Sequence, residues 1–213
     1  MDARELLERY AAGERCFSFP NLECTNLSDT KLIRAELSDV NLFDAKLIRI
    51  DLSDAILSRA ILSGANLGGA NLNRAILSRA ILSGAILSGA NLGGAILIGT
   101  LLSGADLYHA NLSEALLRHA DMYHANLSEA LLKHADMYHA YLRDANLCSA
   151  NLRGANLMSA DLRGANLSYA NLRSTNLQEA DLRKANLFGA NLKSAFICQT
   201  LMPNGEVCNR DCP

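Results

Sequence analysis

Five histidines lie within one short stretch of this 213-residue chain and are the first candidates for chemistry. Imidazole groups bind metal ions and transfer protons near neutral pH, so a cluster of them could form a metal or catalytic site. The stretch is a fifteen-residue duplication, in which DLYHANLSEALLRHA is followed by DMYHANLSEALLKHA. The cluster consists of His109, His119, His124, His134 and His139. Because the duplication alone accounts for their recurrence, we prefer a solvated surface role to a metal or catalytic one.

Six cysteines are the second candidates. They are Cys16, Cys24, Cys148, Cys198, Cys208 and Cys212. No two of them form a CxxC pair, and the tail has no histidine that could complete a zinc site. Cys198 could bridge to Cys208 or Cys212 in an oxidising environment, but reduced thiols in a cytosolic protein are the preferred interpretation.

No other residue pattern of the chain is typical of an enzyme. It contains no nucleophile elbow, no glycine-rich phosphate loop and no pair of carboxylates set in a recess. The net charge is −2, half of the residues are apolar, and no apolar run has the length of a membrane span. The start, MDARELLERY, is charged and lacks an apolar signal segment. We therefore expect a soluble cytoplasmic protein without catalytic residues, cofactor, metal or membrane contact.

Between its two ends, the chain repeats with a period of five residues, so this repeat must position the candidate side chains. A large apolar residue, nearly always Leu, occupies each fifth position from Phe17 to Met202, and a small residue, usually Ala, stands two places before it. A helix would scatter these leucines around its axis, and a flat strand would place successive ones on opposite faces. The chain must therefore bend once per five residues, so that each Leu and its Ala return to one shared interior.

The repeated unit, A-(N/D)-L-x-x, resembles the pentapeptide-repeat family from about residue 16 to residue 202. The resemblance implies an all-β fold, a right-handed quadrilateral parallel β-helix or repeat solenoid, in which four pentapeptides form one square coil. The 38 repeats then correspond to about nine coils. A coil spacing of roughly 4.8 Å predicts a rod roughly 45 Å long. The two ends of the chain are similar to those of bacterial, especially cyanobacterial, members.

The ends depart from the repeat and are predicted to cover the end coils. Residues 1–15 are expected to form a short N-terminal capping helix and the lead-in to the first coil, with Asp2 as N-cap and Gly13 as the stop. Residues 16–202 form the repeat domain. Residues 203–213 form a C-terminal tail or cap that begins with a turn signal, Pro203, Asn204 and Gly205.

Because the implied coil has twenty residues, side chains twenty apart should stack in columns. The predicted histidine stacks are His119 with His139, His109 with Glu129, His134 with Glu114, and His124 with Asp144. Two histidines without a third ligand make a poor metal site, so we expect solvated ladders. The predicted surface cation–π pairs are Tyr138 with Arg118 and Tyr123 with Arg143.

One column, the basic column, carries uncompensated positive charge. It consists of Lys133, Arg153, Arg173 and Lys193, with neutral Asn151, Asn171 and Asn191 beside the last three. The arginines of the opposite face are expected to be neutralised by nearby acids. They are Arg143, Arg163 and Arg183, with Asp144, Asp161 and Asp181. The basic column could bind a polyanion, but a solvated face is the simpler interpretation, because four charges are few for nucleic acid.

The outward position before the core Leu, normally Asn or Asp in the family, becomes apolar through the middle of the chain. This apolar ridge consists of Ile56, Ile76, Ile96 and Leu116 in one column and Ile61, Ile81 and Leu101 in the next. Ser and Gly surround it, and Arg59, Arg74 and Arg79 are expected to form a polar rim. The ladder covers itself in part, and we predict that its remaining apolar area is the main contact surface.

These features predict a non-enzymatic interaction or scaffold protein that binds a partner protein, or a second copy of itself, through flat faces. One alternative is a DNA-mimicking regulator of a DNA-binding protein or topoisomerase, a role that the resemblance implies for some family members. Mimicry requires a strongly negative rod, whereas the acidic excess here is confined to residues 23–54. The other alternative is weak polyanion binding through the basic column.

Overall fold

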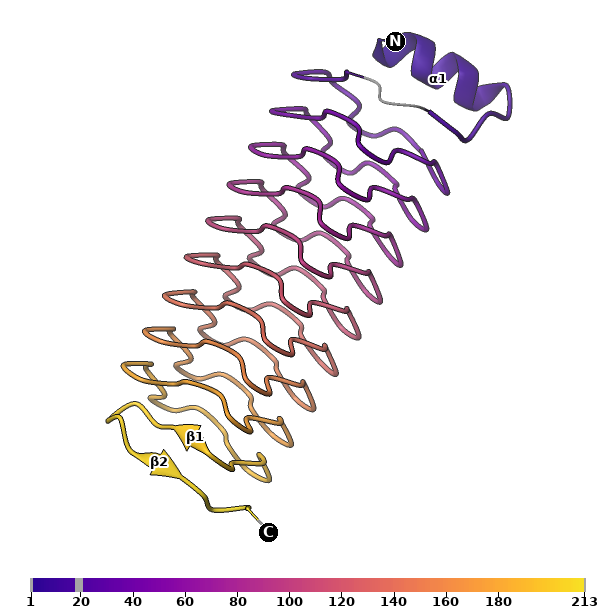
Figure 1. Ribbon diagram of the computed structural model, residues 1–213. Coiled ribbons are helices and arrows are strands. Elements are labelled where there is room, and N and C mark those ends of the chain that lie inside the picture. The colour runs from indigo at the N-terminus through magenta and orange to yellow at the C-terminus, as the bar shows by residue number, and fades with distance from the viewer. Residues whose placement is uncertain (1, 18–20, 213) are drawn as a thin grey trace.

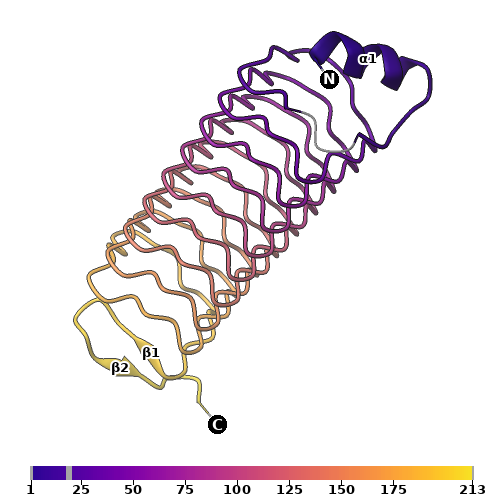
Figure 2. The same ribbon diagram turned by 45° about the horizontal axis from the view of Figure 1, so that its top comes forward.

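The computed structural model describes residues 2–17 and 21–212 of the chain. Residues 1, 18–20 and 213, which belong to the predicted capping segment, repeat domain and tail, lie outside the described residues. The molecule is an elongated rod of stacked coils, with helix α1 at one end and a two-stranded hairpin at the other (Figures 1 and 2). Helix α1 spans Ala3–Ala11, strand β1 spans Thr200–Leu201 and strand β2 spans Val207–Cys208.

Each coil is joined to the next by backbone hydrogen bonds between residues about twenty apart. The amide of Leu37 donates to the carbonyl of Ile56 at 2.7 Å, and the amide of Ile56 donates to the carbonyl of Ala35 at 2.9 Å. Parallel single-residue bridges keep this spacing of twenty from Cys16 to Leu201. In the described residues, β1 and β2 are the only regular strands, so the coils are held by bridges and not by long strands.

The interior of the rod holds the Leu and Ala of the repeats, which are almost all fully buried. In the buried interior, three threonine hydroxyls each donate to the carbonyl of a core leucine in a neighbouring coil. These bonds join Thr100 to Leu77 at 2.8 Å, Thr175 to Leu152 at 3.0 Å, and Thr200 to Leu177 at 2.7 Å. Throughout the described residues, no buried side-chain nitrogen or oxygen lacks a hydrogen-bond partner. The polar side chains of the described core are therefore satisfied within the protein.

The bend that the period of five requires lies at the last residue of each repeat. From Cys24 to Gln199, every such residue has a positive φ, between 52° and 70°. The next residue closes a turn onto the core Leu, as when the amide of Ala80 donates to the carbonyl of Leu77 at 2.9 Å. None of these described last residues is β-branched, which agrees with the steric cost of positive φ for Val, Ile and Thr.

Helix α1 lies over the first coil, as the sequence predicts (Figure 1). The carboxylate of Asp2 accepts a hydrogen bond from the amide of Glu5 at 2.8 Å and so caps the helix. Leu6 is fully buried, and the hydroxyl of Tyr10 donates to the carbonyl of Ile33 at 3.1 Å. The chain leaves the helix at Ala12. No helix of the described residues has the length and apolar character to cross a membrane.

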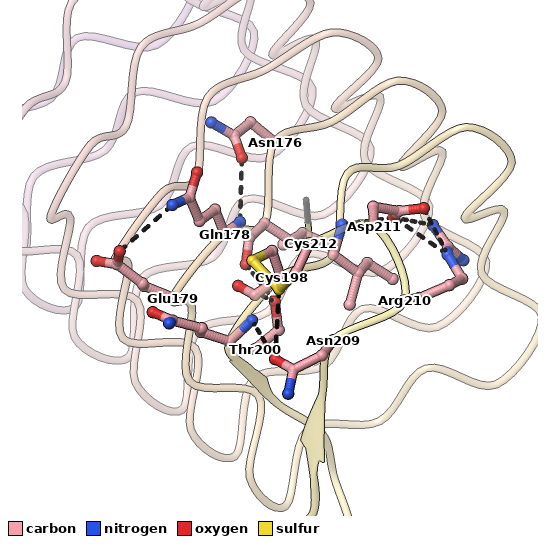
Figure 3. Close-up of a disulfide and its surroundings, with 12 residues drawn as sticks. Asn176, Gln178, Glu179, Cys198, Thr200, Asn209, Arg210, Asp211 and Cys212 are labelled. Atoms are coloured by element: carbon pink, nitrogen blue, oxygen red, sulfur yellow. Dashed lines mark hydrogen bonds and ion pairs between the residues drawn. A yellow bond between two sulfur atoms is a disulfide. The ribbon is translucent and has the colours of Figure 1, made fainter.

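The tail folds back on the last coil and is fixed by a disulfide between Cys198 and Cys212 (Figure 3). The prediction of reduced thiols is wrong for this pair, because the turn after Met202 brings the tail antiparallel to β1. Cys208 lies opposite Thr200 in the β1–β2 pair and keeps a free thiol, whereas Cys212, further along the tail, bonds to Cys198. The described cysteines that remain free are Cys16, Cys24, Cys148 and Cys208.

The positive φ at the end of each repeat predicts how the rod tolerates substitution at Gly84. A Cβ at Gly84 meets nothing within 4 Å, so only the backbone conformation should matter. We expect Gly84→Ala to lower the free energy of unfolding by about 1 kcal/mol, and Gly84→Val to lower it further. Ser83→Ala and Ser83→Val, one residue earlier, are the matched controls and should have smaller effects in urea denaturation. A Gly84→Val variant as stable as Ser83→Val would contradict the prediction.

The disulfide predicts a local effect at the C-terminal end. It closes a segment of 14 residues, and a loop of this size is worth about 3 kcal/mol. We expect Cys212→Ser to increase hydrogen exchange at the amides of β1 and β2 while the middle coils stay protected, whereas Cys208→Ser, which removes a free thiol, should not. Two free thiols at Cys198 and Cys212 in protein purified without reductant, measured by mass spectrometry, would contradict the bridge.

Candidate protein-contact surface

The seven residues of the apolar ridge stack as the sequence predicts. Bridges join Ile56, Ile76, Ile96 and Leu116 in one column, and Ile61, Ile81 and Leu101 in the next. Ile61, Leu101 and Leu116 are exposed, by 38%, 41% and 36%. The four other members are half-buried. Three of the four lie between two apolar neighbours of their column, so the ladder covers itself in part and is most open towards its ends.

The apolar surface extends beyond the predicted ridge. Ile98 is 37% exposed and lies two residues after Ile96, in the place that Ser takes in the two preceding coils. Ile86 is 40% exposed and lies five residues after Ile81, on the next face of the coil. The repeat positions of Ile98 and Ile86 are outward ones, so the sequence alone predicts that both side chains are exposed. The exposed apolar area therefore spans parts of three faces.

A shallow hollow of about 470 Å³ adjoins the second ridge column where it ends at Leu101. Bulky side chains on neighbouring coils wall this hollow. Tyr141 is 52% exposed and is linked to Leu101 through Asp121 by two successive bridges. The lining residues are Leu101, His119, Asp121, Tyr123, Tyr141, Arg143 and Asp161.

The arginines that were expected to rim the ridge are mostly paired with acids of the preceding coil. Arg74 bonds to Asp54 at 2.9 Å, and the guanidinium of Arg59 donates to Asp39. This hydrogen bond holds the pKa of the Asp39 carboxyl below its usual range. The sequence has no Asp or Glu between residues 55 and 105, but coil stacking brings acids from before residue 55 to these arginines. The third predicted rim residue, Arg79, has no ion pair among the described residues.

The same stacking breaks up the acidic segment. Besides Asp39 and Asp54, Asp29 is bridged by Arg49 of the next coil at 2.7 Å. Three of the carboxylates between residues 23 and 54 thus alternate with guanidinium groups along the rod. The surface of this segment does not carry the continuous row of negative charge that DNA mimicry requires.

The four members of the basic column lie in line on successive coils. The amides of His134, Gly154 and Ser174 each donate to the carbonyl of the next basic residue, at 3.1, 2.9 and 3.1 Å. All four members are exposed, and none has an ion pair in the described part of the chain. On the other side of the rod, Arg163 bonds to Asp161 at 2.5 Å and Arg183 to Asp181 at 2.6 Å. These hydrogen bonds lower the pKa of both carboxyls, as expected for neutralised pairs.

The histidines of the duplication form surface contacts. His109 lies 2.8 Å from Glu129, and the rings of His119 and His139 are nearly parallel, with centroids 5.3 Å apart. The other two predicted histidine stacks do not form ion pairs; His134 instead lies over Gly154, whose missing Cβ leaves room for the ring. Nowhere in residues 2–17 and 21–212 do three His, Cys, Asp or Glu residues converge as metal ligands.

The predicted cation–π pairs are replaced by shorter-range contacts. The guanidinium of Arg118 donates to Asp136, and the ring of Tyr138 packs edge to face on His139 at 4.2 Å. Likewise Arg143 pairs with Asp144 at 3.3 Å. A carboxylate within reach holds a guanidinium more strongly than an exposed ring does.

The family model for pentapeptide repeats matches the chain in eight copies. The matched segments are residues 21–59, 60–97, 85–123, 95–133, 125–164 and 165–202. Comparison with curated proteins gives no match.

Several solved structures are similar to the chain. HetL, a pentapeptide repeat protein involved in heterocyst differentiation regulation in the cyanobacterium Nostoc sp. strain PCC 7120, is 39% identical, with 98% of this chain and 100% of HetL covered and a TM-score of 0.57. A pentapeptide repeat protein of the Arabidopsis thaliana thylakoid lumen is 34% identical, with 48% and 71% covered and a TM-score of 0.47.

A trypsin-treated form of QnrB1, a plasmid-mediated fluoroquinolone resistance protein, is 21% identical, with 79% and 89% covered and a TM-score of 0.52. This last similarity concerns the fold alone. The repeat matches span most of the chain, and HetL matches nearly all of it. The chain therefore belongs to the pentapeptide repeat family.

Proposed function

We propose that this protein is a non-enzymatic interaction protein whose apolar ridge contacts a protein partner. The observation that carries the proposal is the stack of Ile and Leu side chains on flat faces of the rod. They occupy the position before the core Leu, where the family repeat has Asn or Asp. Ser and Gly beside the ridge let a partner approach closely, and burial of apolar area is favourable by roughly 25 cal/mol per Å². The Tyr-lined hollow at the end of the second column adds aromatic groups, which are common at interfaces.

Two further parts of the proposal rest on the family. We infer that the stacked coils form the right-handed quadrilateral β-helix that the family resemblance implies. HetL is involved in the regulation of heterocyst differentiation. We infer a regulatory role for this chain too, exerted through the partner that the ridge binds. A cytoplasmic location stays a prediction, and the Cys198–Cys212 bridge favours an oxidising compartment instead.

The ridge can be tested by restoring the family's own residue. We expect the triple variant Ile76→Asn, Ile81→Asn and Ile96→Asn to fold as wild type does, because the core Leu and Ala are untouched. Its affinity for a partner identified by pull-down from the native host should fall at least about tenfold in a direct titration, since three apolar side chains leave the interface.

The matched control is the double variant Leu131→Asn and Phe196→Asn, which removes two exposed apolar side chains at the same repeat position but away from the ridge, Ile86 and Ile98. It should bind as wild type does. If the triple variant keeps the wild-type affinity and sedimentation behaviour, the ridge is not the contact surface.

Weak polyanion binding is a second candidate, favoured by the absence of ion pairs along the basic column in the described chain. We expect heparin binding at low ionic strength to weaken as salt is added and to fall in the variant Arg153→Glu with Arg173→Glu. The variant Arg163→Glu with Arg183→Glu has the same charge change on the neutralised side and should lose less. Binding that is absent, or independent of salt, leaves the column as a solvated face.

A further inference from the structure

One carboxylate in the middle of the rod has no side-chain partner. Aspartate occupies the outward position before the core residue in six repeats, and in five of them its carboxylate accepts a hydrogen bond from a side chain. The five acceptors are Asp51, Asp106, Asp136, Asp161 and Asp181, and their donors, in the same order, are Asn71, Asn126, Asn156, Arg163 and Arg183. The carboxylate of the sixth, Asp121, accepts a hydrogen bond from the backbone amide of Tyr123 at 3.0 Å but from no side chain of the described residues.

The neighbours of Asp121 explain this difference. Bridges join Asp121 to Leu101 of the preceding coil and to Tyr141 of the next, where the column of Asp106 continues with an asparagine. Leu101 carries no hydrogen-bond donor on its side chain. Two residues after Asp121, where the repeats of Asp161 and Asp181 have arginine, this repeat has Tyr123. Apolar and aromatic side chains therefore surround a negative charge that no cation of the described chain pairs with.

Asp121 lines the hollow of about 470 Å³ at the end of the second ridge column. The carboxylate is half-buried there. Tyr123 and Tyr141 line the same hollow and are 41% and 52% exposed, and Leu101 lies beside them. A hollow of this volume is within the range of small-ligand sites, so it has room for one long side chain.

The other Arg and Asp side chains of the hollow already have partners. Arg143 pairs with Asp144 at 3.3 Å, and Asp161 accepts a hydrogen bond from Arg163 at 2.8 Å. The charge that remains uncompensated is that of Asp121. A neutral or anionic group that displaced water from the hollow would leave this carboxylate unpaired, which is costly, whereas a cation would compensate it.

Arginine is the cation whose chemistry matches these walls. Its planar guanidinium donates two parallel hydrogen bonds to a carboxylate and stacks on aromatic faces. The rings of Tyr123 and Tyr141 attract it further through cation–π interaction. The alkyl part of the side chain is apolar and can lie on Leu101. A lysine ammonium has the charge but lacks the planar group that stacks on the rings.

We propose that the hollow is a socket for an arginine side chain of the protein partner, with the guanidinium bonded to Asp121 and stacked against the rings of Tyr123 and Tyr141. Leu101 belongs both to the hollow and to the apolar ridge, so a partner on the ridge lies directly beside the socket. The inference rests on the proposed function only in taking the occupant to be part of a protein partner.

An arginine peptide tests the socket without the partner. The full-length chain is titrated with acetyl-Ser-Leu-Arg-Leu-Ser-amide at low salt, and amide chemical shifts are followed by NMR. We expect saturable shifts at Asp121 and Tyr123 with a dissociation constant of about 1 mM. The same peptide with citrulline, which has the shape of arginine without its charge, should bind at least about tenfold more weakly.

Substitutions in the hollow test the roles of single residues. Asp121→Asn should weaken binding of the arginine peptide at least about tenfold, because the amide can still accept the Tyr123 amide hydrogen bond but carries no charge. Tyr141→Leu should weaken it about threefold through loss of the ring. Asp106→Asn is the matched control: Asp106 has the same repeat position but is already satisfied by Asn126, so binding should not change. Circular dichroism checks that each variant folds.

The socket is overturned if the arginine peptide causes no shifts at about 10 mM, if the citrulline peptide binds equally well, or if Asp121→Asn binds as wild type does. The triple Asn variant of the ridge separates the two proposals, because it leaves the hollow intact and should bind the peptide as wild type does. Loss of the partner in that variant with no effect of Asp121→Asn contradicts the socket alone. Loss of the peptide in Asp121→Asn, with the partner still bound by the triple variant, contradicts the ridge alone.

Discussion

The backbone hydrogen bond between successive coils is the interaction on which the rest of the structure depends. Except for Leu187 and Leu192, the core leucines of the described repeats donate their amides to carbonyls nineteen residues further along, so the register of one coil sets the register of the next. These bonds satisfy backbone N–H and C=O groups that have no local hydrogen-bond partner in a chain that bends every five residues. The buried Leu and Ala between them supply the apolar contacts, but it is the regular bond spacing that turns a sequence period into a straight rod.

Because the register never shifts, the surface is a set of columns, and the chain can place one chemistry in one section of the rod. The first coils alternate Asp with Arg of the following coil, the middle coils present Ile and Leu, and the last coils carry the basic column. Stacked neighbours along a column lie within contact distance, so each section tends to neutralise or cover itself. The apolar and basic side chains that remain exposed or unpaired along their columns are available to a partner.

The ends of the rod differ in how completely they are closed. Helix α1 covers the first coil with Leu6 and fixes its position through Tyr10. The tail does not continue the coil, because the turn after Met202 returns the chain antiparallel to β1. The coils are regular along the rod, but the last one is only partly covered by the tail. Exposed backbone and aromatic groups therefore lie at this end.

The sequence by itself determined the interior, the coil of twenty residues and the columns, since all three follow from the period of Leu and Ala and the family resemblance it carries. It also placed the apolar ridge and the basic column. Tertiary structure decided the partners of individual surface groups: Arg59 reaches Asp39, and Arg118 binds Asp136 in place of Tyr138. Side chains eighteen and twenty residues away compete for the guanidinium of Arg118, and only their conformations settle the choice. Tertiary structure also decided the Cys198–Cys212 bridge, which depends on the position of the turn after Met202. It decided the hollow beside Leu101 as well, which depends on the positions of aromatic rings that the repeat does not specify.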